Sequence, residues 1–150
     1  EGLVTGNITL EIWDDVTEPG SAVLNSSGGG TRYLSLLIYP ISSGISISGD
    51  ISGPMIDLSG ADNVTIDGRV DRSGSADLVI TNTSTSNGSS ASTIRFIESA
   101  NTNTIQYCYI YGSETNATSG IILFSTASTG SGNDGNIIDN NYITIDSSPT

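Results

Sequence analysis

The sequence contains no lysine, no histidine and a single cysteine, and these absences exclude several kinds of site. Its four basic residues face 16 acidic residues, which gives a net charge of −12 at pH 7. A chain with this charge repels nucleic acid and anionic membrane surfaces. Because Cys108 has no partner in the chain, neither an internal disulfide nor a cysteine-based zinc site can form.

Long hydrophobic runs are also missing, and strong helix formers such as lysine, glutamate, glutamine and methionine are scarce. No stretch approaches the roughly 18 apolar residues that a membrane-spanning helix needs, so we expect no membrane insertion. Glycine is abundant, with 18 copies, and serine, threonine and asparagine dominate the polar residues. This composition favours short strands separated by turns. Since Glu1 is neither a start methionine nor part of a signal peptide, we expect a processed, cloned or resolved fragment of a longer exported protein.

What the sequence does contain is an internal repeat. The segment Asn103–Ile110 (NTIQYCYI) matches the segment Asn136–Ile143 (NIIDNNYI) at an offset of 33 residues. Asparagine, isoleucine, tyrosine and isoleucine recur in one register. Equivalent side chains would therefore lie above one another if each repeat were one turn of a coil.

Apolar alternation predicts strands along the whole chain. The strands of residues 1–53 and of residues 54–150 are expected to be arranged differently. Residues 1–53 read as an N-terminal strand-rich or capping segment, in which Ile8, Leu10 and Ile12 share one face. Residues 54–150 read as about three rungs of short strands joined by sharp turns and by polar loops of variable length. We expect such rungs to continue in a longer parent chain.

The predicted fold class is all-β, specifically a right-handed parallel β-helix. Strands this short cannot bury an apolar face alone, whereas rungs stacked at about 4.8 Å share one continuous core. A β-sandwich is the alternative, because many short strands with regularly spaced turns also suit that fold. The repeat of 33 residues favours the β-helix.

Two segments carry a family resemblance, Gly49–Gly68 (GDISGPMIDLSGADNVTIDG) and Asp77–Ser84 (DLVITNTS). They resemble the pectin-lyase-like right-handed β-helix repeats of very large secreted surface proteins of Bacteroidetes-type bacteria. The resemblance implies a β-helix fold and an extracellular or cell-surface location. Members of this family are mostly adhesin-like or filament-like, and enzymes of this fold cleave acidic polysaccharides.

Asp57 and Arg95 are the charged residues that the rungs are expected to bring together. Each lies between two inward apolar residues, so both should point outward and form a surface ion pair worth well under ~1 kcal/mol. A lyase reading needs Arg95 or the turn at residues 69–72 as its base. A hydrolase reading needs two carboxylates on one face, about 6.5 to 9.5 Å apart. The candidates for such a pair are Asp57, Asp67, Glu98 and Asp139.

Other polar residues are assigned structural roles. Asn63, Asn103 and Asn136 open equivalent strands, and their amides should bond turn backbone groups and form a ladder. Tyr109 should stack on Tyr142. Cys108 aligns with Asn141 and is expected to be a small buried side chain rather than a reactive thiol.

Metal binding has little support in the sequence. The glycine-rich loop at residues 130–136 has some likeness to calcium-binding turns of tandem repeats, but a single copy is better explained as a plain turn. We expect no cofactor, and at most weak calcium binding at the acidic surface.

These observations predict a secreted or cell-surface structural module, adhesin-like and not an enzyme, that forms part of a stalk or filament. Its expected partners are further copies of itself, other surface proteins or glycans. The alternative is a carbohydrate-binding or polysaccharide-cleaving module. That alternative requires Arg95 in an exposed groove, flanked by carboxylates or by aromatic residues such as Tyr107 and Tyr111.

Overall fold

The computed structural model describes residues 6–28, 32–126 and 132–145. These residues form fourteen short strands and a single turn of 3-10 helix, η1 (Val70–Arg72). The strands are β1 (Asn7–Ile12), β2 (Val16–Glu18), β3 (Ala22–Asn25), β4 (Ser35–Pro40), β5 (Ser46–Gly49), β6 (Pro54–Ser59), β7 (Val64–Asp67), β8 (Val79–Asn82), β9 (Ser92–Ile97), β10 (Thr104–Gln106), β11 (Tyr109–Gly112), β12 (Ile122–Phe124), β13 (Ile137–Asp139) and β14 (Tyr142–Thr144). No helix in the described ranges is long and apolar enough to span a membrane.

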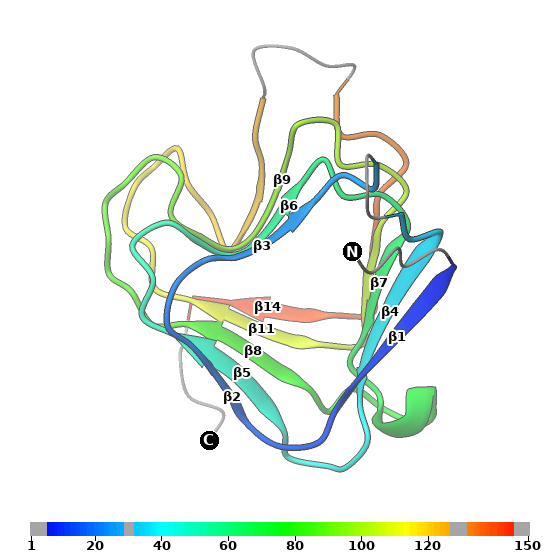
Figure 1. Ribbon diagram of the computed structural model, residues 1–150. Helices are drawn as coiled ribbons and strands as arrows, with labels where there is room; N and C mark the ends of the chain where they lie inside the picture. The colour runs from blue at the N-terminus through cyan, green and yellow to red at the C-terminus, as the bar shows by residue number, and fades with distance from the viewer. Residues whose placement is uncertain (1–5, 29–31, 127–131, 146–150) are drawn as a thin grey trace.

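Every third strand belongs to the same sheet, and all named strand pairs are parallel. Sheet A has the order β1-β4-β7-β10-β13, sheet B the order β2-β5-β8-β11-β14, and sheet C the order β3-β6-β9-β12. The three sheets are the three walls of a right-handed coil (Figure 1). The predicted parallel β-helix is therefore confirmed. A β-sandwich is excluded because its sheets are built from antiparallel pairs.

The coil begins earlier than the sequence indicates. Strands β1 to β5 were expected to form a separate segment over residues 1–53, yet they pair in register with later strands of the same three sheets. The rungs predicted after residue 54 correspond to β6 to β14 in groups of three. The earlier rungs could not be predicted from the repeat, because the repeated asparagine and tyrosine occur only in the later turns.

Inward residues form apolar columns that run from rung to rung. Ile66, Ile105 and Ile138 are in register in sheet A, as the 33-residue repeat predicts for the last two. In sheet C, the rings of Phe96 and Phe124 stack with centroids 4.6 Å apart and planes 4° apart. The middle of each column is fully buried. Burial of about 25 cal/mol per Å² of apolar surface in these columns is the main source of stability.

Candidate functional site

The Asp57–Arg95 pair forms as predicted, but it is not a surface pair. Asp57 and Arg95 are in register on β6 and β9, and the guanidinium binds the carboxylate through two hydrogen bonds, Nε to Oδ1 at 2.9 Å and Nη2 to Oδ2 at 2.7 Å. The side chains are only 7% and 18% exposed. Val23 and Leu123 flank the pair in the adjoining strands. Loss of one partner from a largely buried pair costs more than the surface estimate, because the other charge is left uncompensated.

A second carboxyl group lies beside the same strand and was not singled out from the sequence. Glu114, two residues after β11, places Oε1 at 3.4 Å from the hydroxyl oxygen of Thr93 in β9. Burial of the side chain raises the pKa of Glu114 above its usual range. A sequence signal existed, since Glu114 is the only carboxylate between Glu98 and Asp134.

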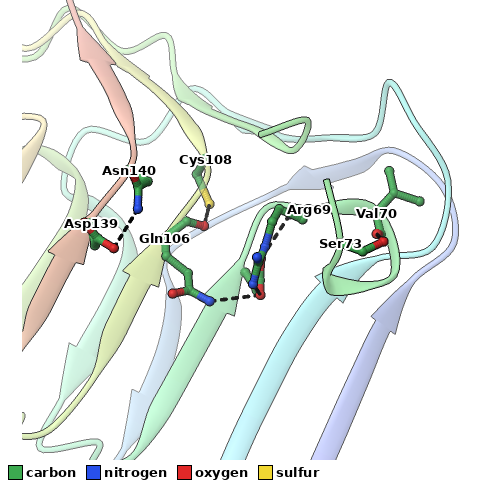
Figure 2. A network of polar contacts seen from close by, with 8 residues as sticks. Arg69, Val70, Ser73, Gln106, Cys108, Asp139 and Asn140 are labelled. Carbon is green, nitrogen blue, oxygen red and sulfur yellow. Dashed lines mark hydrogen bonds and ion pairs between the residues drawn. The ribbon is translucent and has the colours of Figure 1, made fainter. Parts of the chain in front are cut away.

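The outer face of sheet A carries a separate polar cluster around Asp67, and Figure 2 shows two of its members, Arg69 and Gln106. Arg69 donates from Nε and Nη2 to the two oxygens of Asp67, at 2.9 and 2.7 Å, and Gln106 donates from Nε2 at 2.9 Å. The guanidinium of Arg69 also lies over the ring of Tyr107, with Cζ 4.2 Å from the ring centroid. Burial opposes the charge on Asp67. The hydrogen bonds from Arg69 and Gln106 outweigh this effect and hold the pKa of the carboxyl below its usual range.

This arrangement divides the candidate carboxylates of a carbohydrate-cleaving site between two sheets. Tyr107 lies against Arg69 and not against Arg95. Asp57 belongs to sheet C, whereas Asp67 and Asp139 are in one outward row of sheet A with Gln106 between them. Both Asp57 and Asp67 have two oxygens engaged by an arginine.

Corner asparagines form a ladder, as predicted for Asn103 and Asn136. The amide of Asn103 accepts from Val64 N at 2.9 Å and donates to Ala61 O at 2.8 Å. Asn136 repeats this pattern one rung later, accepting from Asn103 N and donating to Ala100 O. In each case an amide of one rung holds the turn of the rung before it.

Asn63 is not part of this ladder, so its assignment was wrong. The strand register aligns Val64 with Asn103, and Asn63 lies one residue earlier, exposed and with a left-handed φ of 58°. Asparagine tolerates this conformation better than most residues, which explains its presence at the turn. Asn63 and Asn103 share a residue type but differ by one position in the strand register.

Three further asparagines also use their side-chain amides to bond backbone groups of a neighbouring rung or loop. Asn141 accepts from Cys108 N at 2.8 Å and donates to Ile105 O at 2.7 Å. Asn133 accepts from Ala100 N at 3.1 Å. Asn82 is fully buried and bonds both the N–H and the C=O of Ile51. The sequence signal that identifies Asn141 is the same offset of 33 residues that identifies Asn136.

The remaining predicted residues lie close to their expected places. Tyr109 and Tyr142 are in register, but their rings are 6.0 Å apart and tilted by 57° rather than stacked in parallel. Cys108 is buried, and this burial raises its pKa to about 12, so it is an inert thiol at neutral pH.

Within the described ranges, no group of three acidic or cysteine side chains is arranged to hold a metal ion. The glycine-rich loop at residues 130–136 lies partly outside the described residues. Comparison of the chain with protein-family models, with curated proteins and with solved structures found no match. The resemblance to pectin-lyase-like repeats thus remains a prediction from the sequence.

Proposed function

We propose that this chain is a structural, adhesin-like module of a secreted or cell-surface protein, and that it serves as one section of a stalk or filament. The observation that carries the proposal is that exposed apolar side chains lie near the two ends of the coil. Every exposed large apolar side chain of the described residues either precedes β4 or lies in β12 or later. These side chains are Leu10, Trp13, Val23, Leu34, Phe124, Ile137, Tyr142, Ile143 and Ile145.

The surface of the middle rungs has a different character, which supports the same role. Arg95 and Arg69 are paired with carboxylates, and Arg72 lies over the ring of Tyr39 with Cζ 5.2 Å from the ring centroid. The outward rows carry small hydroxyl residues such as Ser48 and Thr81. Such a wall has little to offer an apolar partner. A column that associates through its ends and remains inert along its sides would have this distribution.

The N-terminal end also has a recess that suits a neighbouring rung. A cavity of about 260 Å³ lies among inward residues of the first two turns, including Leu10, Val16 and Leu24. The outer edges of β1, β2 and β3 are free to pair with further strands within the described structure. A rung stacked on this end, from the parent chain or from another copy, would fill the recess and satisfy the edges.

Sedimentation velocity over a wide concentration range tests the proposal. We expect association that weakens in the variant Trp13→Glu, which places a charge at the N-terminal end. The matched control Thr65→Glu adds the same charge to an outward position of β7 in the middle of sheet A and should leave association unchanged. Equal effects of the two variants would mean that contact occurs along the sides, and the column model would then be wrong.

The alternative, a carbohydrate-binding or polysaccharide-cleaving module, has weaker support. Its distinguishing requirement is an exposed groove in which Arg95 is flanked by carboxylates or by aromatic residues such as Tyr107 and Tyr111. Arg95 is largely buried against Asp57, and Tyr107 contacts Arg69 instead. The one favourable feature is Tyr142, which is 57% exposed beside Tyr109 and offers a ring to a sugar. Binding to an array of acidic and neutral glycans that is lost in Tyr142→Ala would favour this reading.

A further inference from the structure

Two long loops lie against each other on one side of the coil. Loop 83–91 connects β8 to β9, and loop 113–121 connects β11 to β12 (Figure 1). Hydrogen bonds join them: Thr115 N donates to Ser86 O at 3.3 Å, Thr115 Oγ1 to Thr85 O at 3.4 Å, and Asn116 Nδ2 to Asn87 O. Since the first two bonds are long, the attachment at the base of loop 113–121 matters for holding the loop in place.

Glu114 provides that attachment. Its carboxyl group lies directly against the α-carbon of Gly112, where any Cβ would collide with it. The other groups at the carboxyl are the Thr93 hydroxyl and the backbone N–H of Glu114 itself, which donates to the carboxyl. No arginine or other charged side chain contributes to the electrostatics of Glu114 within the described residues.

The hydroxyl proton of Thr93 is already used. Thr93 Oγ1 is 2.6 Å from the backbone oxygen of Tyr111, which can only accept, so the single hydroxyl hydrogen must point there. Towards Glu114, Thr93 therefore presents only lone pairs. An ionised carboxylate at this place would set acceptor against acceptor, whereas a protonated carboxyl can donate to the hydroxyl oxygen.

We propose that the protonated carboxyl of Glu114 donates to Thr93 Oγ1, and that loss of this proton loosens loop 113–121 from the coil. The chain of donation runs from the Glu114 hydroxyl to Thr93 and from Thr93 to Tyr111 O. The contact of 3.4 Å shortens when the carboxyl is protonated, because the lone pairs no longer oppose each other. The contact between Glu114 and Thr93 is thus a latch: it holds loop 113–121 when the carboxyl is protonated and releases the loop when the carboxyl is ionised.

Burial raises the pKa of Glu114, and hydrogen bonding to the carboxyl opposes that shift, so the direction of the shift does not by itself identify the donor. The net charge of −12 acts in the same direction, since a negative chain resists a further negative charge. What distinguishes the two explanations is the direction of the hydrogen bond. If Glu114 donates to Thr93, removal of the Thr93 oxygen destabilises the neutral form; if Thr93 donates to Glu114, it destabilises the ionised form.

Titration of the Glu114 side-chain carbon by NMR separates these cases in three proteins. We expect the pKa of Glu114 to fall by roughly one unit in Thr93→Val, a tenfold change in proton affinity. Thr93→Ser keeps the hydroxyl and should titrate like the parent chain. A rise in the pKa of Glu114 in Thr93→Val, or no change, would overturn the proposal.

Hydrogen exchange of the Thr115 amide tests the latch itself, even if Thr93→Val fails to fold. In the parent chain, protection of this amide, corrected for intrinsic exchange, should fall as the pH rises through the pKa of Glu114. Glu114→Gln places an N–H donor where the acid has its O–H, so protection should persist at high pH. Glu98→Gln, which changes an exposed carboxylate, should behave like the parent chain. Protection that is independent of pH in the parent chain would show that no latch exists.

Discussion

Removal of the buried amide at Asn103 should be among the most damaging single changes to this coil. Asn103 is fully buried, and its side chain satisfies Val64 N and Ala61 O at 2.9 and 2.8 Å. In Asn103→Ala both backbone groups lose their partner in a place that water does not reach. Each unsatisfied buried group costs about 1 to 3 kcal/mol, so the free energy of unfolding should fall by about 2 to 6 kcal/mol.

Asn136→Ala is the matched control, because Asn136 makes the equivalent bonds one rung later. Asn136 itself is only partly buried, so water can reach the space that its amide leaves. The cost should then approach the net value of ordinary hydrogen bonds, about 1 kcal/mol each. The difference between the two variants isolates the effect of burial from that of the amide.

Urea unfolding followed by circular dichroism measures both changes, and hydrogen exchange at Val64 reports the local one. In Asn103→Ala the Val64 amide should exchange faster at low urea, before global unfolding. If Asn103→Ala and Asn136→Ala cost the same, or if Asn103→Ala costs less than about 1 kcal/mol, the reasoning from unsatisfied buried groups is wrong.

Three further predictions concern the corner between sheets A and B. Gly68→Ala should destabilise the coil by about 3 kcal/mol or more, because the new Cβ collides with the backbone of Tyr107; urea unfolding checks this, and an unchanged midpoint contradicts it. Asp67 has a folded pKa below its unfolded value, so its contribution to stability is present above about pH 4 and is lost as the pH falls through the folded pKa. The stability difference between the parent chain and Asp67→Asn should therefore shrink between pH 5 and pH 2, and a constant difference would refute the argument. Limited trypsin digestion should cut after the exposed Arg72 before Arg69, whose side chain is bound to Asp67; mass spectrometry of early fragments shows the order.

The sequence was sufficient for the fold where identical residues recur. Ile105 and Ile138, or Tyr109 and Tyr142, match by eye, and the structure has each pair in register. The first rungs obey the same physics but satisfy it with varied residues, so only their inward alternation was visible. A column needs apolar side chains of compatible size at a given level and does not need identical ones.

The site residues show the same division. The Asp57–Arg95 pair followed from strand alternation, because stacked rungs bring outward neighbours together. The prediction for Asn63 was wrong by one residue, because the turn before β7 contains adjacent polar residues and the sequence alone does not show which of them aligns with Asn103. Glu114 was missed because its surroundings depend on how a loop folds back on β9, and loop conformation has no periodicity from which to infer it.

The direction of the corner amides has a consequence for the order in which the chain is completed. Asn136 and Asn141 reach back to hold turns that were synthesised 33 residues earlier, at Asn103 N and Cys108 N. As the chain emerges from its N-terminus, each turn is therefore left unclamped until the following turn is made. The coil therefore becomes fixed one turn behind the point of growth. A stalled or shortened chain would carry a final turn that lacks these amide hydrogen bonds.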